Sequence, residues 1–211
     1  MSTSLIGVVD YGLGNIQSVC NALERLGCRF SASGDDKVLS KASAYILPGV
    51  GAFGEGIDNL NRSGLRTMLN EHVIEKRKPI LGICLGMQLF ADASEEMGDY
   101  EGLGWIPGRI KMLPSSDGVQ VPHVGWNNLS LRIGDPIFSR IGDGAHVFFD
   151  HSYSFVCDQE YVSAVCSHGI EIVAGVQRDN IFGVQFHPEK SQNDGLRILR
   201  GFFNYAEGCV C

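Results

Sequence analysis

The sequence predicts an α/β fold: a mostly parallel central sheet flanked by helices, with a smaller antiparallel β portion in the second half. In residues 1–91, short apolar runs alternate with amphipathic helical stretches, as in a doubly wound parallel sheet. In residues 108–186, β-rich runs follow one another with almost no helical periodicity, which favours antiparallel hairpins. No linker rich in Pro, Gly or Ser divides the chain, so residues 1–211 are expected to form a single domain.

The first half of the chain supplies strands and helices in alternation. Short apolar runs predict strands at Leu5–Val9, Cys28–Ala32, Ala44–Leu47 and Pro79–Ile83. Apolar residues at helical spacing predict helices over Asn15–Leu26, about Glu55–Asn61, Leu65–Lys76 and Leu85–Ala91. Sheets of this kind bind ligands beyond the carboxyl ends of their strands, so the segments that follow the strands are the expected places for a site.

The second half is expected to add strands and a final helix. Runs rich in β-branched and aromatic residues predict strands at Arg109–Leu113, Asn127–Leu131, His146–Phe149, Tyr161–Cys166, Ile172–Gln177 and Ile181–Phe186. Helical periodicity returns at Gly195–Tyr205. Some of these strands are expected to extend the main sheet, and others to form a small second one.

Composition and charge exclude several classes of protein. The 211 residues are 44% hydrophobic and 19% charged, which is typical of a folded globular chain. With 17 basic and 24 acidic residues the net charge is −7, and no basic stripe indicates a nucleic-acid partner. No apolar run approaches the ~20 residues that cross a bilayer, so no membrane partner is expected.

The seven cysteines follow neither a disulfide framework nor a zinc pattern. Their number is odd, and no CxxC pair or Cys/His quartet has zinc spacing. The N-terminus shows neither the basic region nor the long apolar region of a signal peptide. We therefore expect a cytoplasmic chain with reduced thiols and no metal site.

Two glycine-rich segments follow predicted strands, and neither favours a nucleotide cofactor. Residues Gly49–Gly54 fit the pattern GxGxxG, but Pro48 stiffens the strand exit and no acidic residue ends the next strand. The segment Tyr11–Asn15 lacks the third glycine. Both segments place backbone N–H groups beside strand ends, an arrangement that suits a developing negative charge. No cofactor is expected.

The segment Gly82-Ile83-Cys84-Leu85-Gly86 has the form glycine-x-nucleophile-x-glycine between a predicted strand and a predicted helix. This pattern is typical of a nucleophile elbow, where side chains at the flanking positions would collide as the chain reverses. The N-terminus of the helix also favours a thiolate. The sequence therefore predicts Cys84 as a nucleophile, against the alternative of a buried cysteine in a tight turn.

A thiolate nucleophile needs an acid and base for its leaving group, and His187 is the candidate. Among six histidines, His187 ends a predicted strand and is followed by Pro188 and Glu189. In an extended backbone, which Pro188 favours, His187 and Glu189 project to the same side. A carboxylate in that place accepts the imidazole N–H and fixes the tautomer.

The elbow and the His-Pro-Glu segment resemble those of the class I, triad-type glutamine amidotransferases. Within that family the chain is similar to the glutaminase subunits of imidazole glycerol phosphate synthases, which act in histidine biosynthesis. The matching segments span the chain: Asp10–Asn15, Leu47–Gly54, Gly82–Gln88, Gly104–Trp105, Val121–Asn127, His151–Tyr153 and Gly183–Ser191. The resemblance implies the flavodoxin-like fold of this family.

The resemblance also implies roles for individual residues. The triad would consist of Cys84 as nucleophile, His187 as acid and base, and Glu189 as its orienting carboxylate. The oxyanion hole would use the backbone N–H groups of Leu85 and of Val50 or Gly51. The substrate would be held by Gly51, Gln88, Glu96, His151, Ser152 and Tyr153, with Glu95 as the alternative to Glu96. The partner interface would include Asn15 and Lys190.

The reaction implied by the resemblance is hydrolysis of L-glutamine to L-glutamate and ammonia. No P-loop or second domain is visible in the chain, so another chain is expected to consume the ammonia. The resemblance implies a heterodimer with a cyclase of the (β/α)8-barrel type. That cyclase would form imidazole glycerol phosphate and an aminoimidazole carboxamide ribonucleotide.

Other functions stay open at this point. One is a paralogous glutaminase subunit that feeds another amidation, such as amidino or guanidino groups on surface sugars. Asp150 favours it, because the family more often has an apolar residue there. A different class is an idle regulatory subunit or a cysteine hydrolase on the same fold, against which the complete triad and the glutamine contacts argue. The tail Cys209–Cys211 is unfamiliar and carries no prediction.

Overall fold

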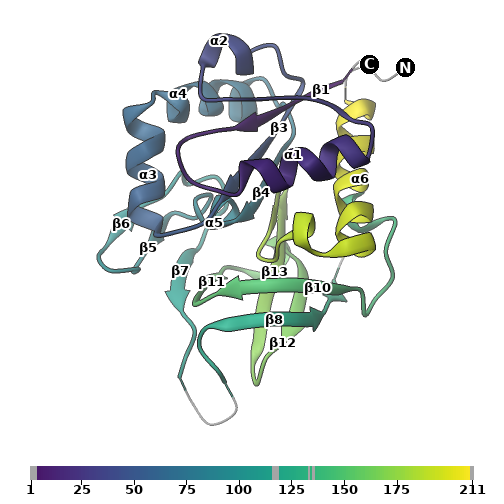
Figure 1. Ribbon diagram of the computed structural model, residues 1–211. Coiled ribbons are helices and arrows are strands. Elements are labelled where there is room, and N and C mark those ends of the chain that lie inside the picture. Colours follow the sequence, from purple (N-terminus) through teal and green to yellow (C-terminus); the bar gives the residue numbers. More distant parts are fainter. Residues whose placement is uncertain (1–3, 116–118, 133, 135, 210–211) are drawn as a thin grey trace.

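An eight-stranded sheet forms the centre of the molecule. The computed structural model describes residues 4–115, 119–132, 134 and 136–209, and within these ranges the sheet has the order β2-β1-β3-β4-β14-β13-β12-β9 (Figure 1). Its strands are β1 (Leu5–Val9), β2 (Arg29–Ser33), β3 (Ala44–Gly49), β4 (Ile80–Cys84), β9 (Ser130–Leu131), β12 (Val162–Ser167), β13 (Glu171–Arg178) and β14 (Ile181–Val184). The strands from β2 to β14 are parallel and the others antiparallel. The expected α/β fold is confirmed.

Two smaller sheets stand beside the carboxyl ends of the parallel strands (Figure 1). One has the order β11-β7-β5-β6 and consists of β5 (Ala93–Ser94), β6 (Tyr100–Glu101), β7 (Arg109–Met112) and β11 (Tyr153–Val156). The other is an antiparallel ribbon of β8 (His123–Asn128) and β10 (His146–His151). The ribbon brings His151 of β10 to the end of the main sheet.

The expected strand Asn127–Leu131 is wrong. The structure divides it between two sheets, because β8 ends at Asn128 and β9 joins the edge of the main sheet beside β12. The inward face of β8 carries His123 and Asn127. A strand whose covered positions are polar is missed by a search for apolar alternation.

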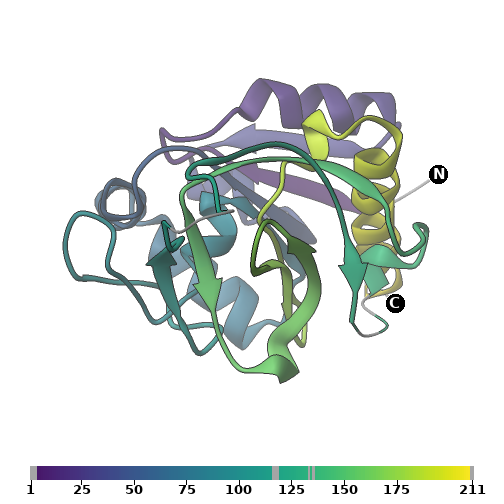
Figure 2. The ribbon, with the colours of Figure 1, turned by 90° about the horizontal axis from the view of Figure 1, so that it is seen from below.

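Helices cover both faces of the main sheet (Figures 1 and 2). On one face, α1 (Ile16–Arg25) and α6 (Gln192–Gly208) bury apolar side chains such as Leu23 and Phe202 against the strands. The other face is covered by α3 (Phe53–Arg62), α4 (Leu65–Leu69), the π-helical turn Asn70–Glu75 and α5 (Leu85–Gln88). The short α2 (Asp36–Leu39) lies beside β2.

The helix expected over Leu85–Ala91 is shorter than predicted. After α5, the carbonyl oxygens of Leu89, Phe90 and Ala91 accept hydrogen bonds from the N–H groups of residues 103–106. These carbonyls would otherwise accept from the next helical turn, so the helix cannot continue. The same hydrogen bonds anchor the loop that carries Glu96.

No helix in the described ranges is long and apolar enough to span a membrane. The six cysteines in those ranges are free thiols. Cys211, in the unfamiliar tail, lies outside the described residues.

Candidate active site

Cys84 lies on a strained turn between β4 and α5. Its backbone has φ 54° and ψ −112°, a conformation that residues other than glycine rarely adopt. The flanking glycines have no room for a side chain. A Cβ on Gly86 would overlap the carbonyl oxygen of Leu47, and a Cβ on Gly82 would lie 2.7 Å from the carbonyl oxygen of Gly86. This is the geometry of a nucleophile elbow, which holds the sulfur above the end of the sheet.

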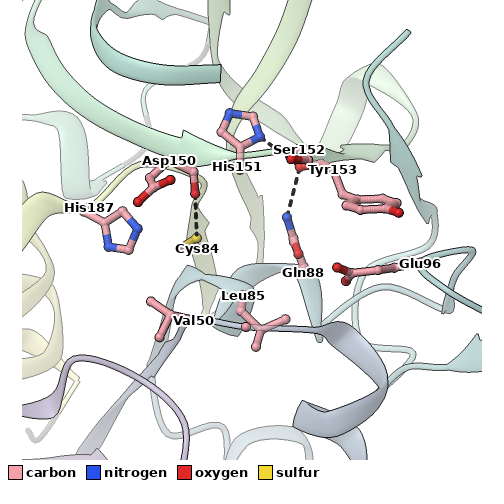
Figure 3. Close-up of a pocket in the computed structure, with 11 residues that line it drawn as sticks. Val50, Cys84, Leu85, Gln88, Glu96, Asp150, His151, Ser152, Tyr153 and His187 are labelled. Carbon is pink, nitrogen blue, oxygen red and sulfur yellow. Dashed lines mark hydrogen bonds between the residues drawn. The ribbon is translucent and has the colours of Figure 1, made fainter. Parts of the chain in front are cut away.

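Cys84 faces a polar pocket of about 240 Å³ (Figure 3). The lining residues are Val50, Gly51, Cys84, Leu85, Gln88, Glu96, Asp150, His151, Ser152, Tyr153 and His187. All except Asp150 are residues that the sequence singles out for the reaction, and the structure brings them together. The volume suits a small polar molecule rather than a dinucleotide.

The imidazole of His187 is held from behind by Glu189. His187 Nδ1 lies 2.8 Å from Glu189 Oε1, and both side chains are 2% exposed. The expectation of an extended backbone here is wrong, because Pro188–Lys190 forms a 3-10 turn. The carboxylate therefore reaches the ring across this turn, and not from the same side of a strand.

The groups around His187 favour the protonated form of its imidazole. Burial lowers the pKa of its imidazole, but hydrogen bonds with Cys84 and Glu189 raise it by more, to about 10. An imidazolium beside the sulfur favours a thiolate and holds a proton for a leaving group. Cys84 Sγ also lies 3.9 Å from the carbonyl oxygen of Asp150 (Figure 3). The arrangement can attack a carbonyl carbon and protonate the group that leaves.

Glu96, and not Glu95, belongs to the pocket. Glu96 Oε2 accepts a hydrogen bond from the backbone N–H of Phe53, over 2.8 Å, at the start of α3. Glu95 Oε1 instead lies 3.3 Å from the backbone nitrogen of Met112, outside the pocket. Among the described residues, no hydrogen bond engages the other oxygen of Glu96, so it can accept one from a ligand. The negative charge of the carboxylate suits an ammonium group.

His151 lines the pocket, but both of its ring nitrogens have protein partners. Nδ1 donates to the carbonyl oxygen of Tyr153 over 2.8 Å, and Nε2 lies 3.0 Å from Nδ1 of His123. Burial lowers the pKa of His151 to about 4, so the ring is neutral. The ring therefore contributes shape to the pocket and has no nitrogen left for a substrate.

Comparison with known proteins identifies the family. The family model described as glutamine amidotransferase class-I matches residues 7–205. The chain belongs to this family. It is 42% identical over 203 residues to the imidazole glycerol phosphate synthase subunit HisH 2 of Vibrio vulnificus, covering 96% of this chain and 95% of that protein. It is 44% identical over 200 residues to the subunit HisH of Archaeoglobus fulgidus, covering 95% and 98%.

Solved structures share the fold of this glutamine amidotransferase. The structure of PurLQS from Thermotoga maritima matches with a TM-score of 0.76 at 22% sequence identity, over 97% of this chain and 99% of that chain. The crystal structure of a glutamine amidotransferase from Thermotoga maritima matches with a TM-score of 0.62 at 17% identity, over 100% and 86%. The resemblance that the motifs indicate is thus confirmed for both the family and its fold.

Sequence reasoning missed two buried residues behind the pocket of this amidotransferase. Gln185 contacts Cys84 Sγ through Nε2 at 3.7 Å, and His123 contacts His151. The alternation of strand side chains is a signal for Gln185, because it precedes His187 by two residues. His123 has no such signal, since its strand, β8, does not belong to the main sheet that carries Cys84.

The two residues expected at a partner interface lie outside the pocket. Asn15 is the N-cap of α1, where its side chain accepts from the backbone N–H of Ser18 over 3.3 Å. Lys190 Nζ lies 5.6 Å from the centre of the Phe148 ring. Asp150 is exposed at the rim of the pocket.

Proposed function

We propose that this chain hydrolyses L-glutamine to L-glutamate and ammonia and passes the ammonia to a cyclase subunit in histidine biosynthesis. The observation that carries the glutaminase is the strained Cys84, which faces the buried pair of His187 and Glu189. The identity of 42% and 44% to HisH subunits, over nearly the whole of each chain, supports the pathway.

The first half of the proposed reaction forms a thioester. The Cys84 thiolate attacks the side-chain amide carbon of glutamine, and the carbonyl oxygen becomes an oxyanion. Backbone N–H groups of Leu85 and of Val50 or Gly51 hold that oxyanion, and loss of one such donor typically costs ~3 kcal/mol of barrier. The His187 imidazolium gives its proton to the nitrogen, the C–N bond breaks, and ammonia leaves.

The second half regenerates the thiolate. Neutral His187 removes a proton from water, whose oxygen adds to the thioester carbon. The C–S bond then breaks, which releases glutamate, and His187 keeps the proton for the next cycle. Glu189 holds the ring in the tautomer that both halves require.

The polar groups of the pocket suit the α-ammonium of glutamine. Both hydrogens of the Gln88 amide are engaged, because Nε2 contacts the carbonyl oxygen of Tyr153 and Oε1 of Gln185, each at 3.0 Å. The Gln88 oxygen is therefore left as an acceptor. Together with the Glu96 carboxylate it offers acceptors on one wall, which match an ammonium group.

The partner in this proposal is a cyclase of the (β/α)8-barrel type, bound over the face that includes Asn15 and Lys190. This cyclase makes imidazole glycerol phosphate and an aminoimidazole carboxamide ribonucleotide, and the reaction takes place in the cytoplasm. The ammonium group of Lys190 is a donor of the kind expected in the polar rim of such an interface.

The proposal is tested by glutamate release from glutamine, measured with and without the candidate cyclase and its nucleotide. We expect strong stimulation by the cyclase and loss of all release in Cys84→Ala. Release that depends on Cys84 but not on the cyclase would refute the histidine pathway and keep the glutaminase. Absence of release under every condition would refute the glutaminase itself.

A further inference from the structure

Gln185 is the buried amide that contacts the nucleophile. It is fully buried directly after β14, two residues before His187. Its Nε2 lies 3.7 Å from Cys84 Sγ, and its Oε1 accepts from Gln88 Nε2 over 3.0 Å. A buried amide is costly unless its polar atoms are paired. The sulfur and Gln88 are the side-chain groups that pair it.

Hydrogen bonding alone determines the orientation of the Gln185 amide. The carbonyl oxygen of Tyr153 can only accept, so the Gln88 atom 3.0 Å from it must be nitrogen. The same nitrogen faces the Gln185 amide, so the Gln185 atom opposite it must be oxygen. The nitrogen of Gln185 is then left to direct an N–H at Cys84.

We infer that Gln185 is a positioning residue that donates an N–H to the Cys84 thiolate and ties the nucleophile to Gln88 on the substrate wall. A Cys84 thiol can donate to the Asp150 carbonyl oxygen at 3.9 Å, but a thiolate has no proton for that contact. A thiolate needs donors, and Gln185 supplies one in addition to His187. The link to the substrate rests on the proposed glutaminase function, whereas the link to the thiolate does not.

Gln185 differs from the other groups around the sulfur because it carries no charge at any pH. The titratable groups near Cys84 are His187 with Glu189 behind it, Asp150, His151, Tyr11 and Glu96. Burial and the charge of Cys84 raise the pKa of Tyr11, so its hydroxyl stays neutral. The N–H of Gln185 therefore acts equally at all pH values. We expect it to move the pH midpoint of Cys84 reactivity without adding a second inflection to the pH profile.

The test is the pH dependence of Cys84 alkylation by iodoacetamide, followed at the Cys84 peptide by mass spectrometry. In Gln185→Met, which keeps the volume and removes the donor, we expect the midpoint to rise by about one pH unit. In Gln185→Glu, a carboxylate oxygen faces the sulfur and the rise is larger. Gln177→Met is the matched control, a half-buried glutamine of β13 outside the pocket, and its profile stays at the wild-type midpoint.

The inference is overturned if the pH midpoint of Cys84 alkylation in folded Gln185→Met equals that of the wild type. If that variant does not fold, the wild-type chain supplies the test through the side-chain ¹⁵N–¹H resonances of Gln185. We expect their chemical shifts to change with pH at the same midpoint as Cys84 alkylation. In Cys84→Ala we expect this change to be absent. Resonances that stay constant through the midpoint also overturn the inference.

Steady-state kinetics of the proposed synthase separate the effect of Gln185 on the Cys84 thiolate from its effect on Gln88. Loss of the donor in Gln185→Met is expected to lower kcat about tenfold, and the loosened Gln88 is expected to raise KM. A fall in kcat with unchanged KM would overturn the tie to Gln88. If the wild-type protein hydrolyses no glutamine, the proposed function fails, and the alkylation midpoint still decides whether Gln185 serves the thiolate.

Discussion

His123 donates a hydrogen bond from Nδ1 to Nε2 of His151 over 3.0 Å, in the wall behind the candidate active site. The direction is fixed because His151 Nδ1 donates to the carbonyl oxygen of Tyr153, which leaves Nε2 as the acceptor of a neutral ring. His123 Nε2 in turn lies 3.3 Å from Nδ2 of Asn127, which donates to it. The two neutral histidines thus join the side chains of β8 and β10 at the end of the ribbon that lines the pocket.

Loss of this hydrogen bond is expected to destabilise the protein. His123→Leu leaves His151 Nε2 buried without a donor, which lowers the free energy of unfolding by about 1–3 kcal/mol. Urea denaturation at pH 7 measures the change. The control is His146→Leu, an exposed histidine of the same ribbon. A loss in His123→Leu no larger than in this control would contradict the prediction.

The same pair predicts a loss of stability in mild acid. Burial lowers the pKa of His123 and of His151 to about 4, whereas histidine in an unfolded chain titrates near 6.5. As the pH falls from 6.5 to 4, the unfolded chain binds protons that the folded chain does not, so the free energy of unfolding falls. Each such proton contributes a slope of up to about 1.4 kcal/mol per pH unit.

The variant His123→Leu isolates one of these protons. Its free energy of unfolding, measured by urea denaturation between pH 4 and pH 6.5, should depend less steeply on pH than that of the wild type. Parallel curves for the two proteins would show that His123 is protonated in the folded state.

Removing the charge of Glu189 should impair turnover more than binding. Glu189→Gln keeps the shape of the side chain but no longer stabilises the His187 imidazolium, so we expect kcat to fall by about 10²- to 10⁴-fold with KM nearly unchanged. Steady-state glutamate release from glutamine, measured in the presence of the proposed cyclase partner, gives both constants. Glu171→Gln, which changes a surface ion pair, is the control. A kcat of Glu189→Gln equal to the control value would exclude the orienting role.

A change at Glu96 should affect KM, whereas the change at Glu189 affects kcat. If the Glu96 carboxylate binds the α-ammonium of glutamine, Glu96→Gln removes a charge-assisted hydrogen bond and raises KM by about 10- to 100-fold. The neighbouring Glu95→Gln is the matched control, because Glu95 contacts the backbone nitrogen of Met112 and does not line the pocket. Equal KM values for the two variants would remove Glu96 from the substrate site.

Much of the main sheet could be predicted because its strands are short apolar runs that end at punctuating residues. β1 matches the predicted range Leu5–Val9, and β3 begins at Ala44 as expected. The ribbon and β11 could not be predicted as well, because their positions depend on contacts with distant segments. α5 ends after four residues for the same reason, since residues 103–106 take its following carbonyls.

In the site too, the parts formed by consecutive residues could be predicted, and the parts formed by contacts between distant segments could not. The elbow is local, so five consecutive residues predict the strained turn at Cys84. Gln185 and His123 both lie in segments that match the family, Gly183–Ser191 and Val121–Asn127. Their roles could not be predicted, because each acts on a side chain that is far away in sequence. The choice between Glu95 and Glu96 also needed the structure, because it depends on which carboxylate reaches Phe53.

The tight fit of Gly86 against Leu47 also constrains how this protein can diverge. A single added methyl group at Gly86 overlaps the backbone of β3, so mutation cannot adjust the elbow gradually. Val50, which is 40% exposed, and Asp150 at the rim are free of this restriction. Descendants of such a chain can therefore acquire new partners by altering the rim of the pocket, while the turn that carries the nucleophile is inherited unchanged.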